Sequence, residues 1–351
     1  MSFVRASALS LLYPLFTITL FGFGLIFSVK MVLGTPQPVE QALTQSGIYN
    51  VMAKQVISDN QGNDSTSLPL QQPQVQAAVQ QAFPPALLQQ SVNQILNGTY
   101  TWLQGKNATP TFHVDLTGAK TNLANAVATY VQQRLDSLPA CTLANLPADL
   151  NNINPYTLSC VPSTLDKTAV VQQVKQGVLN NTDLIDNPVI TADTLKNGDG
   201  QTLTNQLRVI PRIYKDVLLG IYITGLVAVL TGVGIVLLHA SRRAGLRHVA
   251  VTALLVGALS SGIAFLGAYV LTRASDNLAH NSRTTLIQSK LVQVIRLLAD
   301  DLRHWWIGYG LGLILAGVIT LVVLRTTKTR TPPTVLPQHV VDGGPPVALA
   351  G

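Results

Sequence analysis

Charged side chains are scarce in this sequence of 351 residues. Only 11% of the residues are Asp, Glu, Lys or Arg, whereas 47% are hydrophobic and the mean hydropathy is +0.32. An ordinary soluble domain carries roughly 25% charged residues. A shortage of this size excludes a simple water-soluble domain as a description of the whole chain, and it predicts a membrane protein.

Sequence signatures of catalysis are missing too. There is no phosphate-binding glycine loop, no Gly-x-Ser-x-Gly motif and no His-Glu-x-x-His motif. The six histidines are scattered, and the alternation of His113 with Asp115 is a weak signal that exposed polar residues explain better. We therefore predict a protein that is not an enzyme, with no catalytic residues, no metal site and no cofactor.

Cysteine is nearly absent, and the two that occur are Cys141 and Cys160. No histidine or third cysteine lies nearby, which argues against a zinc site. Outside the cytoplasm the two thiols are expected to form a disulfide, which would stabilise the fold by about 3 kcal/mol. Two buried thiols are the alternative.

What the sequence does contain is long apolar runs. Four of them, residues 6–29, 217–238, 249–272 and 305–324, include no ionisable side chain other than tyrosine. A helix of about 20 residues crosses a hydrocarbon core of roughly 30 Å, so each run is predicted to span a membrane. The absence of intramembrane charge also disfavours an ion-coupled transporter.

The first run has a second interpretation, because Arg5 precedes it and Gly34 follows it, as in a cleaved signal peptide. Its apolar length exceeds the roughly 7 to 15 residues of a signal-peptide core, which favours an uncleaved anchor.

Basic residues flank the runs unevenly. They occur at the N-terminus (Arg5), between the second and third runs (Arg242, Arg243, Arg247) and after the fourth (Arg325, Lys328, Arg330). Basic segments stay in the cytoplasm, so both termini are predicted to be cytoplasmic and residues 35–212 and 273–303 extracytoplasmic, in a plasma membrane. Residues 273–303 also carry five basic residues, but these are diluted and partly matched by three acids. This placement explains the net charge of +7 without a nucleic-acid partner.

Helical periodicity marks three stretches of the segment between the first two runs: 88–103, 123–135 and 170–178. Pro84 and Pro85 suit a helix start, Gly105 suits a helix end, and Ser163 with Asp166 has the form of a capping box. A further helix at 39–57 is expected to continue from the first run. The stretch TFHVDL alternates like a short strand, for which the sequence offers no identifiable partner.

The predicted fold is therefore an all-α membrane protein, with four transmembrane helices and a mainly helical extracytoplasmic domain inserted between helices 1 and 2. The predicted parts are a cytoplasmic stub with helix 1 (1–34), the extracytoplasmic domain (35–212), helices 2 to 4 with an amphipathic extracytoplasmic helix at about 280–303 (213–325), and a disordered cytoplasmic tail (326–351).

The amphipathic helix carries one apolar stripe, consisting of Ile287, Leu291, Val294, Ile295, Leu298 and Leu302. The extracytoplasmic domain is expected to cover this stripe. The alternative is a helix that lies along the bilayer surface.

Glycines recur in the spans, and Gly308 with Gly312 has the spacing that lets helix backbones approach closely. Packing within one bundle is the first interpretation of this pair, and self-association into a homo-oligomer is the second.

One segment matches a known pattern at Pro84, Pro85, Tyr100, Leu103, Gly105, Val114, Asp115, Leu116 and Lys120. In this pattern, a helix that begins with proline ends near a Tyr/Trp-Leu-x-Gly turn, and an apolar-Asp-Leu segment begins the next helix. Residues 83–120 thus resemble uncharacterised bacterial four-span membrane proteins with a large extracytoplasmic helical domain, and this resemblance implies no activity. The order of one span, a domain and three spans is similar to that of the permease subunits of mechanotransmitting ABC systems, although the connection at 239–248 is short for gripping an ATPase.

We predict a non-catalytic membrane protein whose partners are the lipid bilayer and a protein bound by the extracytoplasmic domain. The alternative, which the second resemblance implies, is a membrane subunit of a transport or mechanotransmission complex with a cytoplasmic ATPase.

Overall fold

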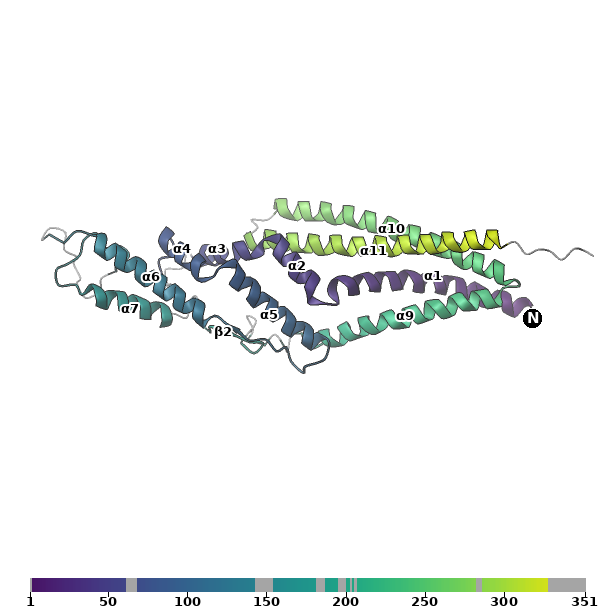
Figure 1. Cartoon of the computed structure of the whole chain (residues 1–351), viewed down its shortest axis with the longest axis horizontal. Coiled ribbons are helices and arrows are strands. Elements are labelled where there is room, and N and C mark those ends of the chain that lie inside the picture. The colour runs from purple at the N-terminus through teal and green to yellow at the C-terminus, as the bar shows by residue number, and fades with distance from the viewer. Residues whose placement is uncertain are drawn as a thin grey trace, which may run out of the picture.

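The computed structural model describes residues 2–60, 68–142, 154–180, 187–194, 200–202, 204, 207–281 and 286–327. Within these ranges the chain forms ten helices and one two-stranded sheet. The molecule is elongated, with a bundle of long helices at one end and shorter helices at the other (Figure 1). The predicted tail from residue 328 onward lies outside the described residues.

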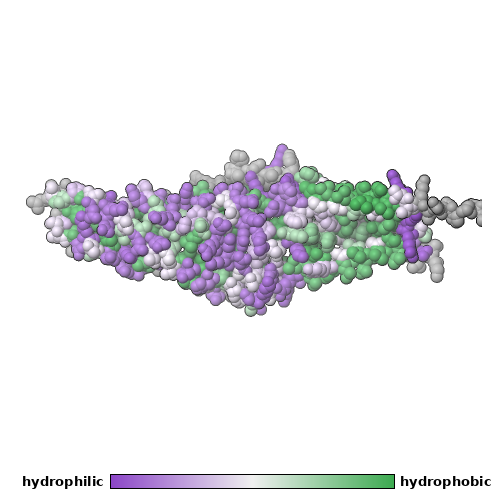
Figure 2. Space-filling model, viewed as in Figure 1, coloured by the Kyte–Doolittle hydropathy of each residue, from purple (hydrophilic) through white to green (hydrophobic). Residues whose placement is uncertain are grey.

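Four helices are long and apolar enough to cross a membrane: α1 (Ser2–Leu33), α9 (Ile210–Leu238), α10 (Arg242–Asn281) and α11 (Leu286–Thr326). Large apolar side chains lie on the outer faces of these helices and are more than 60% exposed, for example Leu11, Leu266 and Leu315. Figure 2 shows the result as a hydrophobic band over the bundle, with hydrophilic residues on both sides of it. The all-helical fold and the four apolar helices confirm those parts of the prediction.

Glycines on α9 receive aromatic side chains from α1. A Cβ added at Gly225 would lie 3.1 Å from the Phe23 ring, and one at Gly232 would lie 3.2 Å from the Phe16 ring. The missing side chains therefore make room for the rings, which is how small residues allow helices to pack in lipid.

The backbones of α10 and α11 approach each other more closely than those of α1 and α9. A Cβ on Gly257 would lie 2.6 Å from the Gly310 carbonyl oxygen, and one on Gly317 would lie 2.8 Å from the Ala250 carbonyl oxygen. Side chains at these positions would force the two helices apart.

The pair singled out in the sequence occupies a different face of α11. Gly308 and Gly312 are exposed, and nothing lies within 4 Å of a Cβ built on either. Packing within the chain thus uses Gly310 and Gly317, while self-association through Gly308 and Gly312 stays a prediction.

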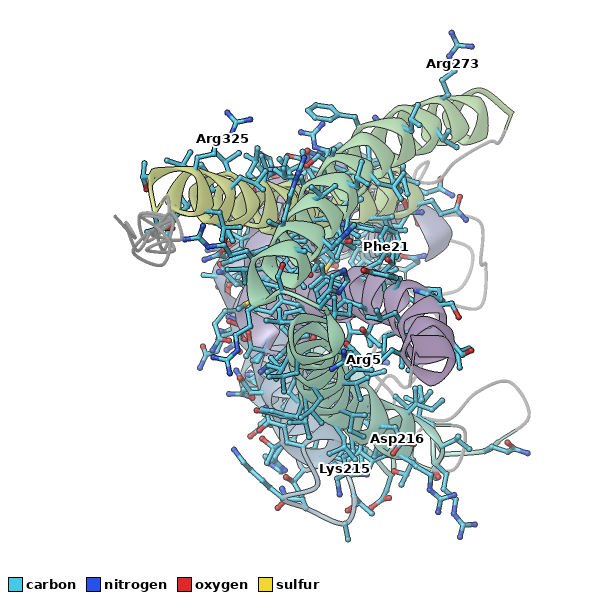
Figure 3. The ribbon with its side chains drawn as sticks, turned by 90° about the vertical axis from the view of Figure 1, so that its right-hand side faces the viewer. Arg5, Phe21, Lys215, Asp216, Arg273 and Arg325 are labelled. Carbon is cyan, nitrogen blue, oxygen red and sulfur yellow. A yellow bond between two sulfur atoms is a disulfide. The ribbon has the colours of Figure 1, made fainter. Side chains whose placement is uncertain are left out.

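Aromatic residues join α1 to α11. The Tyr309 hydroxyl donates a hydrogen bond to the Leu20 carbonyl at 2.6 Å, and the Tyr309 ring fills the space that a side chain on Gly24 would need. The rings of Phe21 and Trp306 meet edge to face, with centroids 5.8 Å apart. Phe21 lies on α1 in Figure 3, which looks along the bundle.

The first span does not continue as a single helix into the inserted domain, which we define as residues 35–212. Pro36 cannot donate the backbone hydrogen bond that continuity needs, and Thr35 before it is extended, with ψ 158°. The predicted helix at 39–57 is instead two helices, α2 (Pro36–Ser46) and α3 (Ile48–Asn60), separated by Gly47 at φ 68°.

The inserted domain has its own hydrophobic core, built by α3, α4 (Pro73–Ala82), α6 (Thr117–Ser137) and α7 (Lys167–Asn180). Val75 and Val79 of α4 pack with Leu123 and Val127 of α6, and all four are at most 2% exposed. The predicted stripes at 123–135 and 170–178 form the facing sides of α6 and α7. The stripe of α4 was not predicted.

Helix ends follow local chemistry. Pro84 and Pro85 open α5 (Pro85–Leu103), and Gly105 beyond its end has φ 73°, both as predicted. The start of α7 differs from prediction. Asp166, not Ser163, caps it, because the Asp166 Oδ1 accepts hydrogen bonds from the backbone amides of Thr168 and Ala169 at 2.9 and 3.1 Å.

The predicted strand finds a partner far along the chain. β1 (Val114–Asp115) pairs antiparallel with β2 (Val189–Ile190), so that Val114 faces Ile190 and Asp115 faces Val189. The Asp115 Oδ1 accepts a hydrogen bond from the Thr117 backbone amide at 2.8 Å at the start of α6. Hydrogen bonds from Thr117 lower the pKa of the Asp115 carboxyl.

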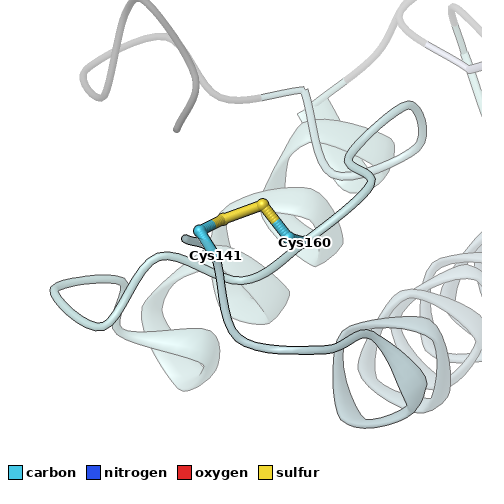
Figure 4. Close-up of a disulfide and its surroundings, with 2 residues drawn as sticks. All are labelled: Cys141 and Cys160. Atoms are coloured by element: carbon cyan, nitrogen blue, oxygen red, sulfur yellow. A yellow bond between two sulfur atoms is a disulfide. The ribbon is translucent and has the colours of Figure 1, made fainter. Parts of the chain in front are cut away.

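Cys141 and Cys160 form the predicted disulfide (Figure 4). A short parallel contact supports it, in which the Cys141 amide donates to the Val161 carbonyl at 3.0 Å. A second core cluster of Val131, Leu135 and Leu158 also contains half-buried Val161. The bond thus joins the two ends of the connection between α6 and α7.

The first part of α11, from Leu286 onward, covers most of the amphipathic helix predicted at about 280–303, and α10 ends at Asn281. α11 then continues without a break into the bundle, and its first half packs against α2 and α3. Val294 is buried, whereas Leu291 and Ile295 stay 44% and 58% exposed. The apolar stripe is therefore covered only in part.

Candidate functional site

A groove of about 720 Å³ runs along α5 in the inserted domain. One wall is α5, and the other is the segment 111–113. Side-chain amides dominate the helix wall: Gln89, Gln90, Asn93, Gln94 and Asn97. Positions four apart lie on one helix face, so these amides form two adjacent rows, one of Gln89, Asn93 and Asn97 and one of Gln90 and Gln94. Within a row, neighbouring residues are separated by about 6 Å along the helix axis.

Gly98 allows the two walls to meet. A Cβ at Gly98 would lie 2.4 Å from the Thr111 carbonyl oxygen, so only glycine lets the 111–113 segment approach α5 this closely. Phe112 is 8% exposed and packs inward, and the Asn107 side-chain amide donates to the Thr111 hydroxyl at 2.6 Å. The second wall is therefore held in place by the fold.

Two of the amides have fixed partners on α2. The Gln89 amide donates to the Thr44 hydroxyl at 3.2 Å, and the Asn97 amide donates to the Glu40 carboxylate at 3.1 Å. Asn93 lies between them on the same face, and its Oδ1 is buried without a hydrogen-bond partner among the described residues. A buried acceptor without a donor costs roughly 1 to 3 kcal/mol, which a ligand N–H would offset.

The electrostatics of the groove restrict what it can bind. His113 is the one ionisable side chain among its lining residues, and it is exposed. Exposed Gln90 and Gln94 offer free donors and acceptors toward the groove. The site suits an uncharged ligand that presents alternating hydrogen-bond donors and acceptors.

The base of α5 contacts the bundle. Tyr100 is 9% exposed, and its ring meets Tyr214 of α9 edge to face, with centroids 6.4 Å apart. Burial raises the pKa of the Tyr100 hydroxyl.

Two of the scattered histidines are neighbours in space. The rings of His239 and His248 have centroids 4.9 Å apart, and the Tyr13 hydroxyl lies 3.4 Å from His239 Nε2. This cluster joins α1, α9 and α10 at the end of the bundle away from the inserted domain (Figure 1). Sequence spacing could not indicate it, because Tyr13 comes from a distant helix.

Within the described ranges, no group of three or more His, Cys, Asp or Glu side chains is arranged to hold a metal ion. Of the residues predicted for structural roles, Cys141 and Cys160 are joined, and Gly308 and Gly312 face open space. The amide groove was missed in the sequence, although the four-residue spacing of its Gln and Asn residues was visible there.

Comparison with known proteins adds no further constraint: no family model, no curated protein and no solved structure matches the chain.

Proposed function

We propose that this protein is a non-catalytic, multi-pass plasma-membrane protein whose inserted domain lies outside the cytoplasm. There, the groove along α5 binds an extended, uncharged segment of an envelope protein. The observation that carries the proposal is the buried Oδ1 of Asn93, which has no hydrogen-bond partner among the described residues and lies between Gln89 and Asn97 on one face of α5.

The distribution of charge supports this orientation. Arg5, Arg325 and the arginines at the start of α10 lie at one end of the bundle, and the inserted domain lies at the other (Figure 1). Basic residues remain on the cytoplasmic side of a membrane. The disulfide in the inserted domain agrees, since such bonds persist in oxidising compartments.

The spacing of the amides favours a polypeptide over a sugar chain. Residues four apart on α5 are separated by about 6 Å, and two residues of an extended peptide span about 6.6 Å. Gln90 and Gln94, which are exposed, can thus contact successive backbone groups on one face of the same strand. Phe112 is too buried to offer a ring face for stacking.

Photocrosslinking in cells tests the groove. A photoreactive amino acid replaces Gln94, and in a matched strain it replaces Gln132, which is exposed on α6 outside the groove. We expect one discrete protein adduct from position 94. The substitution Asn93→Leu should abolish this adduct, whereas Asn122→Leu, which replaces an exposed residue of α6, should preserve it. Identical adducts from positions 94 and 132 would contradict a groove-specific partner.

A second candidate function has one observation in its favour. α11 is a continuous helix that contacts α2 and α3 and then runs to the basic end of the bundle, as a mechanotransmission subunit would require. A cytoplasmic ATPase that copurifies in stoichiometric amount from mild detergent would support this function over the first.

A further inference from the structure

The basic end of the bundle contains a cavity of about 750 Å³ between the first turns of α10 and the last turns of α11. Arg243, Arg247, His248 and Arg325 line its polar part. Arg243 and Arg247 are four residues apart and therefore project from one face of α10. Figure 3 views the molecule from this end and shows Arg325 at the near end of α11.

Two of the arginines that line this cavity face no acidic side chain in the part of the chain that the structure describes. Arg247 and Arg325 have no hydrogen-bond or acidic partner within the described residues. No Asp or Glu occurs in the sequence before Glu40, between Asp216 and Asp276, or between Asp301 and Asp342. The described segments that meet at this end are thus free of acids, and a bound anion can supply the neutralising charge.

The cavity has an apolar floor as well as a basic rim. Val251 continues the face of α10 that carries the arginines, and Leu321 and Leu324 line the α11 side. All three residues belong to helices that are apolar enough to span a membrane. A phosphate free in water needs no such floor, whereas a phospholipid carries its phosphate directly beside hydrocarbon chains.

The walls of the cavity are held together. The Arg243 guanidinium donates a hydrogen bond to the Thr327 carbonyl, which ties the start of α10 to the end of α11. His248 is held from the other side by ring contacts with Tyr13 and His239, at centroid distances of 5.6 and 4.9 Å. Arg247 and Arg325 remain available for a ligand.

We propose that this cavity binds the phosphodiester head group of an anionic membrane lipid, with Arg247 and Arg325 as its donors and an acyl chain against Val251 and Leu321. Arginine forms paired, charge-assisted hydrogen bonds with phosphate oxygens, and basic pockets at helix ends recognise anionic head groups. The proposal requires that the four helices cross a membrane. It is independent of the groove on α5 and of the direction in which the chain is inserted.

Native mass spectrometry of the full chain in a non-ionic detergent tests the site. Dioctanoyl phosphatidylglycerol and dioctanoyl phosphatidylcholine are the probes, since their chains are identical and only the first is anionic. We expect the anionic lipid to be retained at about tenfold lower concentration, and the pair Arg247→Gln with Arg325→Gln to remove most of this preference. The pair Arg247→Lys with Arg325→Lys should give an intermediate value, because lysine keeps the charge and loses the paired geometry.

The matched control is Arg5→Gln with Arg242→Gln, which removes two charges from the same end outside the cavity lining. Equal retention of the two lipids, or an equal loss in the control and cavity variants, would overturn the proposal. Displacement of the anionic lipid by equimolar inorganic phosphate would assign the cavity to a soluble anion and overturn the lipid assignment.

Discussion

The bundle and the inserted domain use the same apolar residues in opposite ways. Between 11% and 33% of each spanning window is buried inside the bundle, and large side chains point outward. In the inserted domain Val75, Val127, Val131 and Leu135 are fully buried. Water drives apolar side chains inward, whereas lipid is as apolar as leucine and gives no such drive.

The two regions also make their closest contacts with different residues. Helices in the bundle approach where a side chain is missing, as between Gly257 and Gly310. Helices in the inserted domain are held by interlocking aliphatic side chains, as between α4 and α6. Each region is therefore sensitive to a different kind of substitution, and this difference can be tested.

The largest effect is expected from truncating the core of the inserted domain. Leu123→Ala should lower the free energy of unfolding by about 2 to 5 kcal/mol, because the substitution leaves a cavity in a packed core. The matched substitution Leu259→Ala removes the same atoms from a side chain of α10 that is 56% exposed, where lipid replaces the lost contacts. Thermal unfolding in detergent, followed by circular dichroism, measures both. Equal losses would remove the distinction between the two regions.

A smaller effect is expected from filling a close contact in the bundle. Gly257→Val should cost about 1 to 3 kcal/mol, because its side chain would meet the Gly310 carbonyl. Gly262→Val on the same helix has open space around it and should leave stability unchanged. The fraction of monodisperse protein after heating, measured by size-exclusion chromatography, separates the two variants. A matching loss in Gly262→Val would show that propensity, not packing, is responsible.

The smallest effect is expected from alkaline pH acting on the inserted domain. Burial in the core raises the pKa of Tyr156 to about 12, whereas an exposed tyrosine in the unfolded chain has a pKa of about 10. The folded state thus holds this proton more tightly. Its stabilising contribution is complete below about pH 10 and is lost as the pH rises toward about 12. Unfolding midpoints over this window should fall less steeply for Tyr156→Phe than for the wild type, and parallel curves would contradict the assignment.

The sequence predicted the features that depend on local pattern. The apolar runs, the stripes of α5, α6 and α7 and the glycine after α5 all follow from residues close together in the chain. The disulfide was also predictable, because Cys141 had only one candidate partner. In these cases the deciding interaction was either periodic or unique.

Features that depend on distant contacts were not predictable. The two-residue β2 has no periodicity of its own, and β1 recruits it across more than 70 residues of chain. Gly310 contacts Gly257, whereas Gly308 faces open space, and this difference depends on how α11 is rotated about its own axis. The groove likewise needs Thr111 and Phe112 opposite α5, and composition cannot show this placement.

Because α11 is continuous, a tilt of its first half would be passed along its whole length. The Tyr309 hydroxyl donates a hydrogen bond to the Leu20 carbonyl of α1, and the Tyr309 ring occupies the space beside Gly24, so α11 can pivot at this residue. At 1.5 Å per residue, about 35 Å of helix lies between Leu286 and Tyr309 and about 26 Å between Tyr309 and Thr326. A tilt imposed beside α2 and α3 would swing Arg325 in the opposite direction, through roughly three quarters of the displacement.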